Sequence, residues 1–263
     1  MDGLLQVVRA FEDPNVAHPA GSVDPVRDLA ALRSEFLLND MVIVERRLQR
    51  LEEERGRGGR DRPAVERETA LFQKLQESLE AERPLRALGL KADEERPLVG
   101  FGLLTLKPAL VVANVGEGQP TPDLGPAGPR SGTLLLQGKL EMEIAQLPAE
   151  DVAAFLAEYG LEEPGLRKAI RASYDLLGVE TFFTVGDDEV RAWRLPRGGT
   201  ALDAAAAVHT DLARGFIRAE VIAWDELIAL GGLSEARAQG KLRLEGKDYP
   251  VQEGEIVHIR FNI

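Results

Sequence analysis

The sequence contains no cysteine, which excludes disulfide bonds and thiolate metal sites and predicts a reducing, cytoplasmic location. Long apolar runs are also missing. The longest, Phe101 to Leu106 and Ala109 to Ala113, are too short to cross a bilayer, so no membrane partner is expected. The chain has only 3 histidines, and no short His/Glu spacing among them predicts a metal site.

A phosphate-binding loop is absent as well. No Gly-x-x-x-x-Gly-Lys-Ser/Thr motif occurs in the 263 residues, although such a loop normally cradles a triphosphate with its backbone N–H groups and a lysine. No Gly-x-Ser-x-Gly motif offers a hydrolase nucleophile either. The motifs therefore predict no catalytic residue.

Positive charge is scarce relative to negative charge. The chain has 32 Lys and Arg against 44 Asp and Glu, a net charge of −12. Because a broad hold on nucleic acid requires clustered cations, we expect no DNA binding, although a local basic patch could still contact RNA. With 44% hydrophobic and 29% charged residues, the composition is that of a globular protein with one or two domains.

The most informative segment present is an apolar run that ends in Asn114-Val115-Gly116-Glu117. We interpret Leu110 to Ala113 as a buried parallel strand, and ligands bind just beyond the carboxyl ends of such strands in doubly wound sheets. Leu4 to Phe11 and Thr133 to Leu136 are predicted as two further buried strands. The Asn-x-x-Glu sequence is then well situated to read a purine base.

Two amphipathic segments predict a helical hairpin. Between Asn39 and Arg55, apolar residues recur in the 3-4-3 spacing of a coiled-coil seam: Met41, Val44, Leu48 and Leu51. A glycine-rich stretch from Gly56 to Pro63 breaks this helix, and a second helix carries Val65, Phe72, Leu75 and Leu79. The tip is either a solvated connection or a contact for RNA or a partner through Arg57, Arg60 and Arg62.

Beyond Gly178 the pattern changes to a small α+β unit. Strands are predicted over Thr181–Val185, Val190–Leu195, Phe216–Ala223 and Ile256–Ile263, and Gly186 to Asp188 form a hairpin turn between the first two. Acidic residues outnumber basic ones here, so a purely electrostatic RNA platform is not expected. The candidates for contact with RNA or ribosomal protein are arginines, which could equally pair with nearby acids: Arg191, Arg194, Arg197, Arg214 and Arg218.

Taken together, several segments resemble the Obg-like ATPase (YchF-type) family. They are spread over the chain: Arg9–Asp13, Gly21–Asp28, Leu104–Pro108, Ala113–Glu117, Phe182–Gly186, Glu189–Trp193, His209–Asp211, Arg214–Val221 and Gly246–Tyr249. The resemblance implies an α/β fold, namely part of a Ras-like P-loop NTPase sheet with an inserted coiled-coil hairpin, followed by a C-terminal β-grasp (TGS) domain. We expect residues 1–38 and 96–178 to form the nucleotide-binding domain, 39–95 the hairpin and 179–263 the TGS domain.

The same resemblance implies a function. Members of the family bind and hydrolyse ATP in preference to GTP and associate with ribosomes. Their base-reading motif corresponds to Asn114, Val115, Gly116 and Glu117, and their second base-contacting loop corresponds to Gln137 and Gly138. In GTPases an Asp at the last motif position accepts two hydrogens from guanine. The extra methylene of Glu117 displaces that acceptor pair, whereas Asn114 still offers a donor and an acceptor to a purine.

The sequence also departs from the family. Members carry a phosphate loop, a Mg²⁺-coordinating switch segment and an Asp-x-x-Gly turn ahead of the counterpart of Leu4, and none of these occurs here. Because phosphoryl transfer depends on them, we expect a chain that lacks an N-terminal segment, binds ATP weakly or not at all, and does not hydrolyse it. Mg²⁺ is expected only in the full-length family protein. The alternative is a noncatalytic module that binds RNA or protein through the hairpin and the TGS domain.

Overall fold

The computed structural model describes residues 1–57, 61–186 and 188–262. These residues form two compact units, Met1–Leu177 and Gly178–Ile263. Within the described residues, no helix is both long enough and apolar enough to span a membrane.

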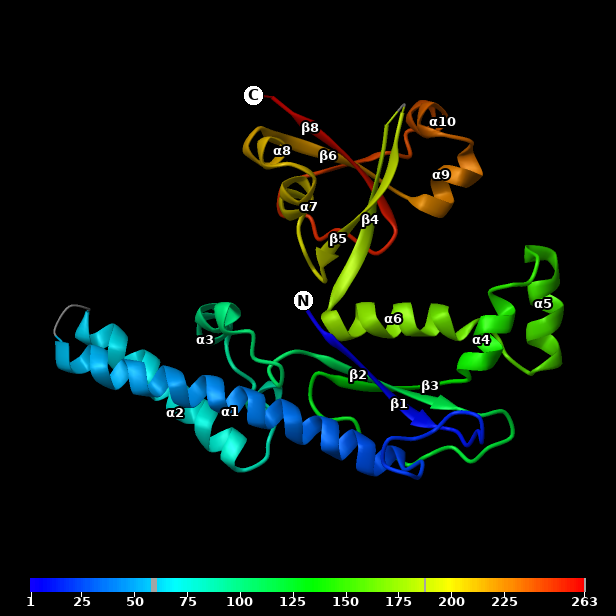
Figure 1. Ribbon diagram of the computed structural model, residues 1–263. Coiled ribbons are helices and arrows are strands. Elements are labelled where there is room, and N and C mark those ends of the chain that lie inside the picture. Colours follow the sequence, from blue (N-terminus) through cyan, green and yellow to red (C-terminus); the bar gives the residue numbers. More distant parts are fainter. Residues whose placement is uncertain (58–60, 187, 263) are drawn as a thin grey trace. The chain divides into compact units, whose positions relative to one another are not determined.

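The first unit is built on a parallel sheet of β1 (Leu4–Ala10), β2 (Ala109–Val115) and β3 (Ser131–Leu136), in the order β1-β2-β3. The three strands that the sequence predicted are confirmed. In Figure 1, α1 (Pro25–Arg57) lies along one face of this sheet and α6 (Gly165–Leu177) along the other. The central strand is consequently buried on both faces, which explains its uninterrupted apolar sequence.

The helical hairpin consists of α1 and α2 (Arg62–Glu80), which lie side by side in Figure 1. The Asp24 carboxylate caps α1 by accepting a hydrogen bond from Arg27 N at 3.0 Å, and Pro25 takes the first helical position. One continuous helix thus begins at Pro25, and the expected boundary at residue 39 falls inside it. The predicted seam residues share one core: Met41, Val44, Leu48, Leu51, Val65, Phe72, Leu75 and Leu79. Arg60, at the predicted tip, lies outside the described residues.

Short elements complete the first unit. A 3-10 turn (Leu85–Leu88), α3 (Ala92–Glu95) and a second 3-10 turn (Arg96–Phe101) lead from the hairpin to β2. After β3 come α4 (Gly138–Ile144) and α5 (Ala149–Glu158). Glu141 of α4 accepts hydrogen bonds from Gly165 N at 2.7 Å and Leu166 N at 3.2 Å, and thereby caps the start of α6 with a carboxylate from a different helix.

The second unit is a mixed five-stranded sheet in the order β5-β4-β8-β6-β7. Its strands are β4 (Val179–Val185), β5 (Val190–Pro196), β6 (Phe216–Ala223), β7 (Arg243–Glu245) and β8 (Glu255–Phe261). The sequence had not predicted β7, which has only three residues. Part of the predicted turn after β4, Asp187, lies outside the described residues.

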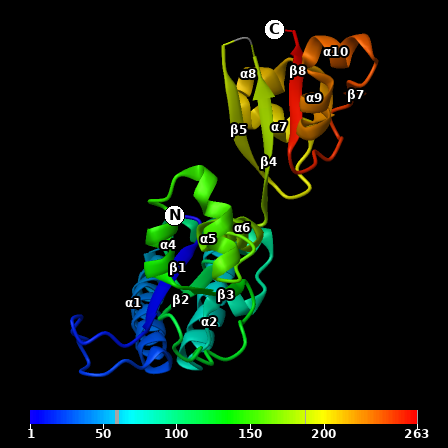
Figure 2. The ribbon, with the colours of Figure 1, turned by 90° about the vertical axis from the view of Figure 1, so that its right-hand side faces the viewer.

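Helices cover both faces of this second sheet (Figure 2). On one face, α7 (Ala201–Val208) and α8 (Thr210–Arg214) pack on a core that includes Phe182, Leu195 and Val221. On the other face, α9 (Trp224–Leu230) and α10 (Leu233–Ala238) pack around Ile222 and Ile256.

Candidate purine-binding site

A cavity of about 420 Å³ opens at the carboxyl ends of β1 and β2. All but one of the predicted base-reading residues line it, namely Asn114, Val115, Gly116, Glu117 and Gln137. The remaining one, Gly138, contacts Asn114 directly. Residues that the sequence had not singled out for this site complete the lining: Phe11, Glu12, Asp13, Val16, Gln119, Lys139, Leu140 and Glu143.

The two predicted base-contacting loops are joined by one hydrogen bond. Gly138 N donates to Asn114 Oδ1 at 2.9 Å. A Cβ at position 138 would lie only 2.9 Å from that oxygen, so the close approach of the loops requires glycine there. With Oδ1 engaged in this bond, Asn114 Nδ2 is the group of this amide that can donate to a ring nitrogen of a purine.

Gln119 links the β2 loop to the segment that follows β1. Its Oε1 accepts a hydrogen bond from Glu12 N at 2.8 Å, and its Nε2 donates to Glu12 O at 3.1 Å. One side-chain amide thus satisfies both polar backbone groups of Glu12. Sequence reasoning missed this clamp because its partners are 107 residues apart and no local pattern connects them.

Arg9, near the end of β1, organises the segment that forms the far wall of the cavity. Its guanidinium lies over the Phe11 ring, 4.6 Å from the centroid, and donates to Phe11 O at 2.9 Å and Val16 O at 2.8 Å. Since Phe11 and Val16 both line the cavity, Arg9 fixes the shape of that wall from behind.

His18 and Asp28 fasten the same segment to α1. His18 Nε2 lies 2.9 Å from Asp28 Oδ2, and His18 Nδ1 accepts a hydrogen bond from Ala20 N at 3.1 Å. A hydrogen bond from Arg27, with added contributions from the positive charges of Arg27 and His18, holds the pKa of the Asp28 carboxyl below its usual value. Asp28 is therefore charged near neutral pH and can accept from both neighbours.

The cavity lining is strongly acidic. Four of its residues are carboxylates (Glu12, Asp13, Glu117 and Glu143), and Lys139 is the one cation among the described lining residues. Glu117 is exposed at the rim, and its charge is the main cause that raises the pKa of the Tyr159 phenol above its ordinary value. A polyphosphate would meet net repulsion here, whereas a neutral purine ring would not.

The five arginines predicted as RNA or protein contacts lie on different elements of the second unit. Arg191 shares a face with Trp193 and stacks over its ring at 4.4 Å from the centroid, while Trp193 Nε1 donates to Thr184 Oγ1 at 2.9 Å. Because successive residues of a strand point to opposite faces, Arg194 lies on the other side of β5.

Arg218 lies far from both of these arginines. Arg218 shares the face of Ile222 on β6, three strands from β5, which is roughly 14 Å or more at the usual strand spacing. Arg214 pairs with Asp211 within α8, and Arg194 and Arg197 both have partners of their own. The structure therefore does not gather the five into one basic patch.

A metal site was not predicted from the sequence. Among residues 1–57, 61–186 and 188–262, no group of three or more His, Asp and Glu side chains is arranged to hold a metal ion. The Mg²⁺ that the family resemblance implies therefore has no such cluster of protein ligands within the described ranges.

Comparison with known proteins shows what this chain is similar to. Over its whole length it is 40% identical to the Ribosome-binding ATPase YchF of Bacillus subtilis and 41% identical to that of Haemophilus influenzae, and it covers 74% and 73% of those proteins. The chain belongs to the YchF family. The YchF-GTPase_C family model, described as "Protein of unknown function (DUF933)", matches residues 179–262, which is nearly the whole second unit.

Solved structures agree with this membership. The YchF GTPase of Schizosaccharomyces pombe aligns with a TM-score of 0.81 at 28% identity, over 98% of this chain and 72% of that one. A GTP binding protein from Pyrococcus horikoshii aligns with a TM-score of 0.54 at 18% identity, which shows the fold alone. The predicted YchF-type fold, a parallel sheet followed by a second domain with a mixed sheet, is confirmed.

Proposed function

We propose that this chain binds a purine base, adenine in preference to guanine, at the Asn114–Glu117 loop, and that it acts as a ribosome-associated regulatory protein. The observation that carries the proposal is the bond from Gly138 N to Asn114 Oδ1, which joins both base-contacting loops at the mouth of one cavity. The position of the cavity supports this proposal, because parallel sheets bind their ligands beyond the carboxyl ends of the strands.

The preference for adenine rests on Glu117. A guanine reader needs a carboxylate at a fixed distance from the N1 and exocyclic N–H groups of the base. The longer side chain of Glu117 shifts that acceptor outward, to the exposed rim beside Tyr159. Without a paired acceptor, the site cannot accept hydrogen bonds from the two N–H groups of guanine. Each such bond to a charged acceptor would contribute about 1.5–3 kcal/mol to guanine binding.

The role of the phosphates is small in this proposal. Four carboxylates line the cavity against one lysine, and the sequence has no Gly-rich phosphate loop. We therefore infer that the chain recognises the base, holds the triphosphate weakly and does not hydrolyse ATP. Phosphoryl transfer also requires Mg²⁺ at the phosphates, and no group of three or more His, Asp and Glu side chains in the described residues is arranged to hold it.

Ribosome association is the second part of the proposal. It rests on relatives at 40% and 41% identity that are named ribosome-binding ATPases. A protein of that role works in the cytoplasm, which agrees with a sequence free of cysteine.

Equilibrium titration with adenosine, ATP, guanosine and GTP tests the base-reading site. Adenosine should bind more tightly than ATP, because the triphosphate meets the acidic lining, and each should bind more tightly than its guanine counterpart. Asn114→Ala should weaken the binding of adenosine and ATP by about tenfold. Equal affinity for all four ligands in wild type and variant would refute the site, and ATP turnover that disappears in Asn114→Ala would refute the absence of hydrolysis.

A noncatalytic interaction module is the second candidate, and one observation favours it. The stacked Arg191 and Trp193 on β5 present a cation beside an aromatic ring, which is a combination that RNA-binding surfaces use. Cosedimentation with ribosomes separates the two candidates. A nucleotide-regulated protein changes its bound fraction when adenosine or ATP is added, whereas a simple module binds equally in both cases and loses binding in Trp193→Ala.

A further inference from the structure

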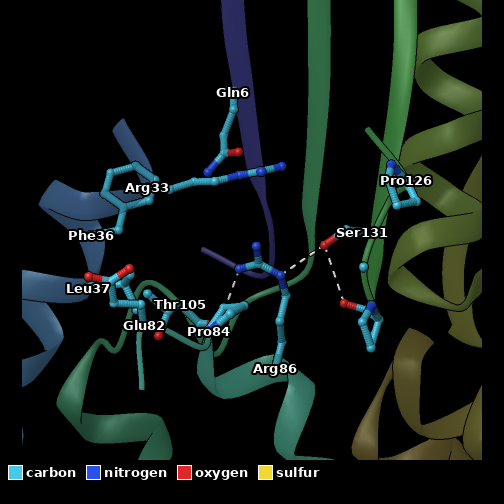
Figure 3. A pocket seen from close by; sticks show the side chains of 12 residues that line it. Gln6, Arg33, Phe36, Leu37, Glu82, Pro84, Arg86, Thr105, Pro126 and Ser131 are labelled. Atoms are coloured by element: carbon cyan, nitrogen blue, oxygen red, sulfur yellow. Dashed lines mark hydrogen bonds between the residues drawn. The ribbon is translucent and has the colours of Figure 1, made fainter. Parts of the chain in front are cut away.

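A second cavity, of about 260 Å³, lies on the α1 side of the first sheet and near the amino ends of its strands. It is lined from several directions by Gln6 of β1, Arg33 of α1, Arg86 of the first 3-10 turn and Ser131 of β3. Figure 3 shows Arg33 reaching from α1 toward Gln6, with the Arg86 guanidinium facing the same space and hydrogen bonded to Ser131. None of these residues belongs to the purine-binding cavity.

Arg86 is a buried cation, with only 8% of its surface exposed. Its Nε donates to Ser131 Oγ at 2.9 Å and one terminal nitrogen donates to Thr105 O at 3.2 Å. A guanidinium has five N–H donors, so these two bonds leave three. Burial lowers the pKa of Arg86 from its ordinary value, and the positive charges of Arg33 and Arg130 lower it further. Both causes disfavour the charged form of Arg86, and no nearby anion offsets them.

The neighbouring charges do not supply that anion. Glu82, the one carboxylate among the described lining residues, is exposed, and it is not among the charges that shift the pKa of Arg86. The buried Asp40 lies nearby in the fold, but its oxygens accept from Leu104 N, Thr105 N and Thr105 Oγ1 at 2.7–2.8 Å. The cavity therefore has a net positive lining.

Gln6 adds a second, independent feature. It is 3% exposed, and its Oε1 is buried with no hydrogen-bond partner among the described residues. A buried acceptor without a donor destabilises the protein, so a ligand that brings a hydroxyl to this point would be favoured. The cavity thus offers guanidinium donors for negative oxygens and one acceptor for an O–H group.

We propose that the cavity formed by Gln6, Arg33, Arg86 and Ser131 binds a phosphate group that carries at least one proton. Phosphate near neutral pH has both negative oxygens for Arg33 and Arg86 and a P–OH group for Gln6 Oε1. Sulfate has the same size and charged oxygens but no proton at that pH. The arrangement should therefore prefer phosphate to sulfate, and the Gln6 acceptor is the cause of the preference.

Equilibrium dialysis with labelled orthophosphate, at constant ionic strength in a chloride buffer, tests the site. We expect saturable binding of one phosphate, at least about tenfold weaker competition by sulfate, and a loss of about tenfold or more in Arg33→Gln. Arg171→Gln, which removes one exposed arginine on α6 that pairs with Glu163, is the matched control and should leave phosphate binding unchanged. Absence of saturable binding, or equal losses in both variants, would overturn the proposal.

Two further variants keep the test independent of folding and of the purine site. Arg86 is buried and its variants can fail to fold, whereas Gln6→Met conserves volume; it should abolish the preference for phosphate over sulfate. Asn114→Ala should leave phosphate binding intact, because that cavity is separate. Loss in Asn114→Ala with retention in Arg33→Gln would locate the phosphate elsewhere and refute the assignment. Competition by glycerol phosphate distinguishes the two sources of the phosphate. If glycerol phosphate displaces the label, the cavity accepts an esterified phosphate; if it does not, only free phosphate fits.

Discussion

Asn114 and Gly138, 24 residues apart in the sequence, are joined by a 2.9 Å hydrogen bond from the backbone N of Gly138 to the side-chain oxygen of Asn114. The bond holds the loop after β2 against the start of α4, so the purine-binding cavity depends on it. The contact leaves no room for a Cβ at position 138.

We predict that Gly138→Ala weakens adenosine binding by about 1–2 kcal/mol, because the new methyl group would push Asn114 away from the loop and break this bond. The measurement is an adenosine titration of both proteins. Gly128→Ala is the matched control, since a Cβ at that position meets no atom within 4 Å. Equal weakening in both variants would show that the loss does not come from the Asn114 contact.

A second prediction concerns pH and the segment that walls the cavity. The pKa of Asp28 is lowered in the folded protein, so its contribution to stability is present above the ordinary value of 3.8 and is lost as the pH falls through the lower folded value. Asp28→Asn should therefore lower the free energy of unfolding near neutral pH, and the difference from wild type should shrink as the pH falls below 3.8.

Urea denaturation at several pH values measures that difference. Glu35→Gln, which neutralises an exposed carboxylate on the same helix, should change the free energy of unfolding little at any pH. If the Asp28→Asn difference stays constant down to the lowest pH at which the protein folds, the charge of Asp28 does not stabilise the segment.

A third prediction follows from Asp40, whose side chain is fully buried in the middle of α1. Its carboxylate accepts three hydrogen bonds from Leu104 and Thr105 and so ties the hairpin to the segment before β2. Asp40→Asn replaces one accepting carboxylate oxygen by an NH₂ group, which would face the N–H and O–H donors of Leu104 and Thr105. We therefore expect a loss of about 2–4 kcal/mol in the free energy of unfolding.

Circular dichroism at the helical band follows this loss during urea denaturation, because α1 and α2 supply much of the helix of the first unit. Glu45→Gln, an exposed acid on the same helix, is the control and should be within about 0.5 kcal/mol of wild type. A comparable stability of Asp40→Asn would mean that the three hydrogen bonds contribute little.

These residues also show what the sequence could and could not predict. The seam from Val44 to Leu79 follows from local periodicity, and the strands follow from apolar runs, because both patterns arise from the geometry of a single element. Asp40 and Thr105, or Gln119 and Glu12, are joined across 65 and 107 residues by polar contacts that leave no periodic trace. The Asn114–Glu117 loop was predicted from its place after an apolar strand and from the family resemblance, whereas the other walls of the cavity became known only from the fold.

The last prediction concerns β1, which in the described residues pairs with β2 alone and forms the edge of its sheet. Leu5 and Val7 are 58% and 61% exposed on one face of that strand. An apolar edge strand with unpaired backbone groups promotes association between chains, so we expect concentration-dependent self-association. Val7→Lys should reduce this self-association, because a charged side chain on an edge opposes strand pairing.

Sedimentation velocity measures the self-association, and Val42→Lys, at a 52% exposed position on α1, is the control that should leave it unchanged. A wild-type chain that stays monomeric at high concentration would contradict the expectation, since the edge strand would then be protected despite its exposure.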